Sequence, residues 1–188
     1  GGALHLYNTT ANIERTLFAF NSATWGGGGA ICQSSKCNLH NSSFYRNEAG
    51  KQGGGLGIAA YVHPFVANLT RIVFIQNKQI DAGTTSYMGG GGLYLNRAVV
   101  VDMRECSFKE NEAAAGTAGN HHGHQIYTVS QGVENGYEGT PSFTLVNTNF
   151  KNIETANPFY GEDDAGHGAA KCVTPTSCAS SPCTVAPF

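Results

Sequence analysis

The tetrad Phe-x-x-Asn occurs four times in the first 111 residues, and it constrains the fold more than any other feature of the chain. The copies are Phe18 to Asn21, Phe44 to Asn47, Phe74 to Asn77 and Phe108 to Asn111. Each copy follows a glycine cluster with a short apolar run, as in Gly28-Gly29-Ala30-Ile31. Two motifs that alternate in this way form an internal repeat, which is typical of stacked repeat architectures.

The residues before each aromatic alternate between apolar and polar. Phe150 aligns as a degenerate fifth aromatic, whose tetrad ends in Ile153 in place of asparagine. The apolar columns are Ala11, Cys37, Ala67, Val101, Phe143 and Ile13, Leu39, Leu69, Met103, Leu145, and the polar column between them is Asn12, Asn38, Asn68, Asp102, Thr144. A period of two is the period of a β-strand, so each unit contains a strand with one face inward.

The units differ in what joins their strands. Successive phenylalanines are 26, 30, 34 and 42 residues apart. Two or three short strands in a minimum of 26 residues, without helical periodicity, predict one coil of a parallel β-solenoid. We therefore expect an all-β solenoid of about five coils over residues 1–160.

Residues 161–188 have a different composition, since they combine three cysteines with Pro175, Pro182 and Pro187. Proline cannot donate a hydrogen bond to a strand ladder. We predict a cysteine- and proline-rich tail that caps, links or docks the solenoid. The chain begins inside a repeat, which suggests a segment of a longer protein or a processed product.

The composition excludes several classes of function. The formal net charge is −2 and only 13% of the residues are charged, so no nucleic-acid partner is expected. No apolar run approaches the length of about 18 residues that a membrane helix requires. We also expect no cofactor.

Three glycosylation sequons begin at Asn8, Asn41 and Asn68, and six cysteines accompany them. Together they favour a secreted or cell-surface protein with attached N-glycans. Cys32 and Cys37 are close enough to bridge one corner of a coil. The pairing of Cys106, Cys172, Cys178 and Cys183 stays open, and Cys37 and Cys106 could equally be buried small hydrophobes.

The paired motifs Gly-Gly-Ala-Leu or Gly-Gly-Ala-Ile and Phe-x-x-Asn resemble the repeats of chlamydial polymorphic outer membrane proteins. They are also similar to right-handed parallel β-helix proteins of the pectin-lyase-like superfamily. The resemblance covers residues 1–111 and fades towards residue 160. It implies a right-handed parallel β-helix that serves as a surface stalk or passenger in adhesion or display.

Each motif has a structural role in such a coil. The phenylalanines would stack into one continuous aromatic column. The tetrad asparagines would form an amide ladder at a corner, as in cross-β stacks. Glycine would supply the positive φ and the close backbone approach that a corner needs.

Candidate chemistry is sparse. Glu162-Asp163-Asp164 and Gly166-His167-Gly168 superficially resemble elements of polygalacturonases, but in that family the elements lie on successive turns and a basic element follows. Here they are almost contiguous, so we expect no enzyme. His121-His122-Gly123-His124 has no fixed partner ligand and is interpreted as polar loop surface rather than a metal site. Trp25 could stack on a glycan, although a lone tryptophan at a turn is more often packing.

The ends of the solenoid suggest the function. A parallel solenoid leaves a bare strand edge at each end, and bare edges accept further strands. We expect a structural filament or stalk component that self-associates end to end, or that continues into further repeats of a longer chain. The alternative is an adhesin or glycan-binding module that uses the insertions at 76–88 and 111–123, and a polysaccharide-active lyase or hydrolase is a third, weaker hypothesis.

Overall fold

The computed structural model describes residues 1–61, 65–81, 89–97, 99–114, 125–129, 142–151, 159–162 and 183–185, and these residues form strands and turns without a helix. The first coil contains four strands, β1 (Leu4–Tyr7), β2 (Thr10–Glu14), β3 (Leu17–Ala19) and β4 (Ser22–Ala23). The second contains β5 (Ala30–Gln33), β6 (Lys36–His40), β7 (Ser43–Tyr45) and β8 (Glu48–Ala49). The third contains β9 (Leu56–Ala59), β10 (Phe65–Thr70), β11 (Val73–Ile75) and β12 (Lys78–Gln79). The fourth contains β13 (Leu93–Asn96), β14 (Val99–Arg104), β15 (Ser107–Lys109) and β16 (Glu112–Ala113).

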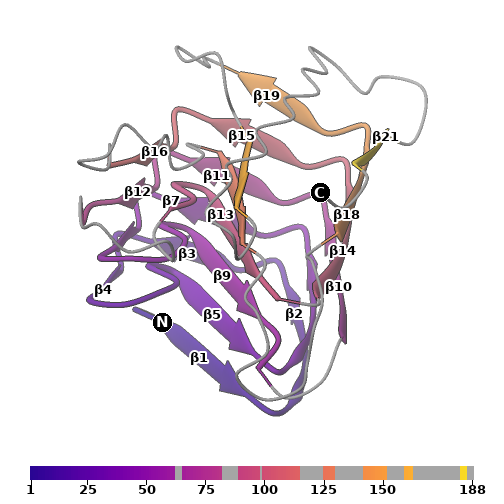
Figure 1. Cartoon of the computed structure of the whole chain (residues 1–188), viewed down its shortest axis with the longest axis horizontal. Coiled ribbons are helices and arrows are strands. Elements are labelled where there is room, and N and C mark those ends of the chain that lie inside the picture. The colour runs from indigo at the N-terminus through magenta and orange to yellow at the C-terminus, as the bar shows by residue number, and fades with distance from the viewer. Residues whose placement is uncertain are drawn as a thin grey trace.

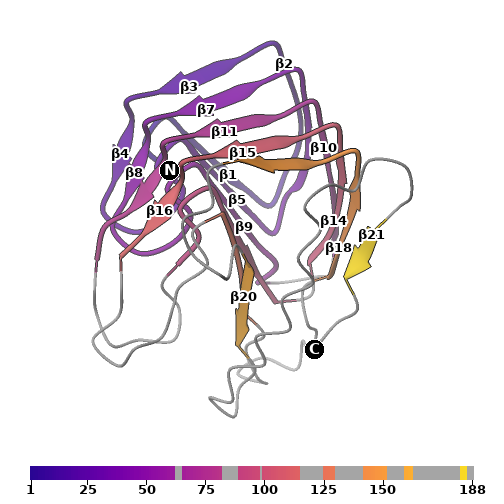
Figure 2. The same cartoon turned by 90° about the horizontal axis from the view of Figure 1, so that it is seen from above.

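The fifth coil contributes β17 (Ile126–Val129), β18 (Ser142–Val146) and β19 (Asn149–Lys151), and β20 (Phe159–Glu162) and β21 (Cys183–Val185) follow. Equivalent strands stack into four sheets, which we name A to D after the order of strands in a coil. Their orders are β1-β5-β9-β13-β17-β20, β2-β6-β10-β14-β18-β21, β19-β15-β11-β7-β3 and β16-β12-β8-β4. The chain winds around a central core, and the coils lie one above another (Figures 1 and 2).

The prediction of an all-β parallel solenoid is confirmed. Two details differ from the prediction. Each complete coil has four strands rather than two or three, because sheet D consists of two-residue strands that are too short to show a period. The coil count also differs slightly from five, since only four coils contribute a strand to sheet D in the described part of the chain.

The register of the sheets matches the sequence alignment around each aromatic. Phe18 pairs with Phe44, Phe44 with Phe74, Phe74 with Phe108, and Phe108 with Phe150. The two clusters that both contain Gly-Gly-Ala are offset by one residue, since Leu4 pairs with Ala30 rather than Ile31. Gly1-Gly2-Ala3 is therefore equivalent to Gly27-Gly28-Gly29, and the shared Gly-Gly-Ala letters of the first two coils do not share a register.

The predicted aromatic column is present. The rings of Phe18, Phe44, Phe74 and Phe108 stack at centroid distances of 4.8, 5.1 and 4.6 Å, with interplanar angles of 8° to 11°. The last glycine of a cluster lies against the tetrad phenylalanine ring of its own coil. A Cβ on Gly29 would stand 2.7 Å from Cδ1 of Phe44, and one on Gly55 would stand 3.1 Å from Cδ1 of Phe74. The glycine cluster and the aromatic tetrad are thus two sides of one packing contact.

The predicted asparagine ladder is also present, and it is buried. Asn77 Nδ2 donates to Phe44 O and to Asn111 Oδ1, both at 2.9 Å, while its own Oδ1 accepts hydrogen bonds from the backbone N and the Nδ2 of Asn47. In the fifth coil the ladder ends on Gln125, whose Oε1 accepts a 2.6 Å hydrogen bond from Asn111 Nδ2. Gln125 stands where the preceding coils have the last glycine of the cluster. Its side chain therefore completes the ladder in the coil that lacks the tetrad asparagine.

The predicted glycine corner is present, but glycine makes only one of the four corners of a coil. Gly27, Gly53 and Gly90 do adopt positive φ, of 60°, 64° and 73°. The three other corners of a coil place a single non-glycine residue in the left-handed region. The corner between sheets B and C is typical, and there Arg15, Asn41, Arg71, Glu105 and Asn147 have φ between 48° and 56°.

The predicted boundary at residue 160 falls inside β20, which pairs in parallel with β17. In the predicted tail, β21 pairs antiparallel with β18. Most of the segment 161–188 lies outside the described residues, so its role as a separate tail stays a prediction. The long insertions at 82–88 and 115–124 also lie outside them.

The aromatic column should carry much of the stability. Replacing Phe74 by alanine removes a fully buried ring between two stacked neighbours, and we expect a loss of about 3 to 5 kcal/mol in the free energy of unfolding. The matched control is Phe20→Ala, because Phe20 is 68% exposed and should cost less than about 1 kcal/mol. Urea unfolding measures both, and equal losses in the two variants would refute the column.

Candidate functional site

A groove runs along the solenoid where sheet C turns into sheet D. One wall is the row of corner residues Phe20, Arg46, Gln76 and Glu110, which all have φ between 50° and 56°. The opposite wall consists of charged residues that open the strands of sheet D, Glu48, Lys78 and Glu112. Together these seven residues line a half-open space of about 510 Å³.

The corner row is held by hydrogen bonds between side chains of successive coils. Arg46 Nε donates to Gln76 Oε1 at 2.8 Å, and Gln76 Nε2 donates to Glu110 Oε2 at 2.7 Å. Each side chain is fixed by the coil above or below it, so the row presents polar groups at the spacing of the coils, about 4.8 Å.

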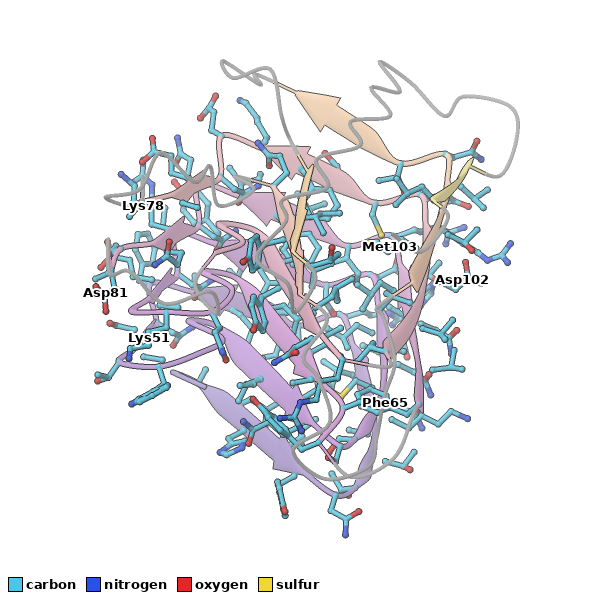
Figure 3. The ribbon with its side chains drawn as sticks, viewed as in Figure 1. Lys51, Phe65, Lys78, Asp81, Asp102 and Met103 are labelled. Carbon is cyan, nitrogen blue, oxygen red and sulfur yellow. A yellow bond between two sulfur atoms is a disulfide. The ribbon has the colours of Figure 1, made fainter. Side chains whose placement is uncertain are left out.

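The row on sheet D alternates in charge. Lys78 Nζ lies 2.9 Å from Glu112 Oε2, and the hydrogen bond and charge of Glu112 raise the pKa of Lys78. Lys78 and Glu112 are about half exposed, so this ion pair contributes little to stability. Lys78 projects from the outer side of the coil stack (Figure 3).

An aromatic pair lies at the end of the groove near the first coil. The ring of Phe20 meets Tyr45 edge-on at a centroid distance of 5.4 Å, and the Arg46 guanidinium lies 5.0 Å from the centre of the Tyr45 ring. An exposed aromatic beside fixed, planar donors and acceptors can bind a polyhydroxylated ligand, because apolar ring faces stack on aromatics while hydroxyls pair with polar groups.

This groove was not among the predicted sites. Its signal is present two and four residues after Phe44, Phe74 and Phe108, where polar or charged residues recur, as at Arg46, Glu48, Gln76 and Lys78. These residues lie in different coils, and only the register of the sheets brings them together.

The outer face of sheet A is exposed in the first coil and buried in later ones. His5 and Tyr7 are exposed, whereas Ile31, Tyr94 and Tyr127 are buried. Tyr94 and Tyr127 stack at a centroid distance of 5.7 Å, and Gln52 Nε2 donates to the Tyr94 hydroxyl at 3.2 Å.

The three sequons occupy two kinds of site. Asn8 and Asn41 are exposed corner residues, each with a φ of 48°. Asn68 lies within β10, partly buried, and its Nδ2 donates to Asn38 Oδ1 at 2.8 Å, as Asn38 Nδ2 does to Asn12 Oδ1. The side-chain nitrogen to which a glycan would be attached is therefore hydrogen-bonded at Asn68, whereas Asn8 is exposed.

Cys32 and Cys37 form the predicted disulfide across a corner. Of the two alternatives for Cys106, a disulfide and a buried small hydrophobe, the structure has the second, because Cys106 is a free, buried thiol. It occupies the corner column of Thr16, Ser42, Ile72 and Thr148. Its Sγ donates to Arg104 O at 3.4 Å, as the three hydroxyls of this column donate to carbonyls two residues back. Cys172 and Cys178 lie outside the described residues, and only the backbone of Cys183 is described.

The other candidate residues have mixed outcomes. Trp25 is 65% exposed, and Lys51 Nζ lies 3.9 Å from the centre of its ring. The histidines at 121, 122 and 124 and the segment 163–168 lie outside the described residues, and Glu162 belongs to β20. Among the described residues, no three histidine, cysteine, aspartate or glutamate side chains gather as a metal site.

Comparisons with known proteins give no match to a family model, to a curated protein or to a solved structure. In the described part of the chain, no helix is long and apolar enough to cross a membrane.

Burial makes Cys106 a source of pH-dependent stability. Burial raises the pKa of the Cys106 thiol from 9.0 to about 12. Below about pH 9 the thiol is neutral in both the folded and the unfolded protein. Above about pH 9 only the unfolded chain loses the proton. The free energy of unfolding therefore falls as the pH rises towards 12, by about 1.4 kcal/mol per pH unit.

Urea unfolding of the protein and of Cys106→Ser between about pH 8 and pH 11 measures this effect. Serine occupies the same corner in the second coil, at Ser42, and does not ionise in this range. We expect a shallower alkaline decline in the variant. Identical slopes for the two proteins would show that the buried thiol is not responsible.

Proposed function

We propose that this chain is a structural segment of an extracellular stalk or filament, in which coils continue along the solenoid axis. The supporting observation is that the stabilising contacts are axial. The aromatic column, the buried asparagine ladder and the outer ladder of Asn12, Asn38 and Asn68 each join one coil to the next. Such contacts are extended by adding coils.

The first coil has the chemistry of a coil that accepts another. Strands β1 to β4 are edge strands of their sheets, and Leu4, Leu6 and Ile13 are only partly buried. Asn21 donates from its backbone N and its Nδ2 to Asn47 Oδ1. Within the described residues its own Oδ1 accepts no hydrogen bond, and the ladder asparagine of a preceding coil would donate to it.

Secretion and glycosylation are part of the proposal. The Cys32–Cys37 disulfide supports an oxidising compartment, and the exposed corners at Asn8 and Asn41 would accept glycans without disturbing a sheet. A relationship to the polymorphic outer membrane protein repeats, or to pectin-lyase-like β-helices, is also proposed on the motifs alone. In this proposal the protein is not an enzyme.

Electron microscopy of the native assembly should show rods, with a fibre-diffraction repeat of about 4.8 Å along the rod axis. Gly54→Ala should abolish the rods, because the added Cβ would lie 2.5 Å from the backbone of Lys78 and Gly91. The control Gly57→Ala should keep them, since its Cβ would make an ordinary 3.4 Å contact. Isolated globular particles in place of rods would argue against a structural role.

The groove between sheets C and D supports a second candidate function, glycan binding. Its walls offer fixed hydrogen-bond donors and acceptors, and Phe20 offers a stacking surface. Gln76, at the edge of a predicted binding insertion, contributes to it. A surface stalk and a glycan-binding groove are compatible in one molecule.

Glycan arrays followed by titration calorimetry would test this second function. Arg46→Ala and Phe20→Ala should each weaken binding of any neutral oligosaccharide that the array identifies by about tenfold, which corresponds to loss of roughly one polar or stacking contact. Arg71→Ala is the matched control, because Arg71 is an exposed corner arginine that pairs with Glu105 outside the groove. Equal effects of the three variants, or no binding at all, would remove this candidate.

A further inference from the structure

The strand β21 differs from every other strand that the structure describes. All the other strand pairs are parallel, whereas β21 pairs antiparallel with β18 through Phe143 to Val185, Thr144 to Thr184 and Leu145 to Cys183 (Figure 2). It is therefore not a further coil of the repeat but a separate strand added to the outer edge of sheet B.

The register determines which backbone groups make this contact. Glu105 N donates to Val146 O, so Val146 faces β14. Because the backbone groups of successive strand residues point to opposite sides, those of Phe143 and Leu145 face β21. Val185 and Cys183 are their hydrogen-bonding partners, and the amide of Thr184 points away from β18.

The contact is short. Pro182 and Pro187 stand close on either side of β21, and proline cannot donate to a ladder, so the pairing cannot lengthen much beyond its three residues. A three-residue edge strand contributes few hydrogen bonds, and such contacts open more readily than the core of a sheet.

The chain that connects β21 to the solenoid is long. Residues 163–182 are 20 residues, which span at most about 66 Å when extended. Five coils stack to only about 24 Å. The connection is thus long enough for β21 to meet the same edge on an adjacent molecule.

We propose that the outer edge of β18 is an interaction surface for β21 of a second copy of this chain, so that copies are joined by exchange of their C-terminal strands. The swapped contact repeats the intramolecular register, with Val185 opposite Phe143 of the partner copy. Reciprocal exchange closes a dimer, and one-way exchange gives an open chain. The inference rests on the proposed structural function, for which it supplies a contact between subunits.

Two neighbouring proline variants test this contact. Val185→Pro removes an amide that faces β18, whereas Thr184→Pro removes one that points away and is the matched control. Sedimentation velocity over a wide range of concentrations should show that the unmodified protein and Thr184→Pro associate as concentration rises, while Val185→Pro stays monomeric. Hydrogen exchange should show that the amides of Phe143 and Leu145 lose protection in Val185→Pro alone.

Isotope mixing identifies the exchanged strand. In an equal mixture of ¹⁴N- and ¹⁵N-labelled full chains, a lysine cross-linker should give mixed-isotope links between Lys171 and Lys151. Links within one isotope only, a monomer at every concentration, or undiminished association of Val185→Pro would each overturn the exchange. Rods that persist in Val185→Pro would also overturn the strand exchange, but they would leave the proposed structural function intact. Association that depends on β21 but forms no rods would support the strand exchange and contradict the proposed structural function.

Discussion

In the second, third and fourth coils, the contact between the last glycine of the cluster and the phenylalanine ring of the same coil is the constraint on which the solenoid depends. Gly29, Gly55 and Gly92 lie where any Cβ would stand 2.7 to 3.1 Å from a ring carbon of Phe44, Phe74 or Phe108. This close approach lets sheet A lie against the rings of sheet C. The rings can then stack along the axis, and the asparagine amides come within hydrogen-bonding distance beside them.

The stacking of identical residues also explains why the outer surface can vary. Once the core columns hold successive coils in register, each outward position becomes a row with one residue per coil. Rows of polar residues pair along the axis, as in the Arg46, Gln76 and Glu110 row, and two such rows enclose a groove. The opposite face shows the same division, with Met103 inside and Asp102 outside on the adjacent position of β14 (Figure 3). The core contacts and the outer groove therefore use different residues of the same repeat.

The two ends of the coil stack are chemically different. Tyr127 and Leu145 in the fifth coil are buried, whereas Leu4 and Ile13 in the first are only partly so. At the later end β20 and β21 cover the edges of sheets A and B.

The sequence by itself determined the strands of sheets B and C, the aromatic column and the asparagine ladder. Residues at a fixed distance from the aromatic of each coil must stack when the coils stack. It also indicated the Cys32–Cys37 bridge, whose residues are neighbours in the chain. Only the tertiary structure decided the features that depend on several coils or on short elements. The two-residue strands of sheet D carry no period, and Gln125 completes the ladder from a different motif. Cys106 is buried in a corner column that combines hydroxyl residues with Ile72, and β21 adds to a sheet edge that no pattern in its own sequence specifies.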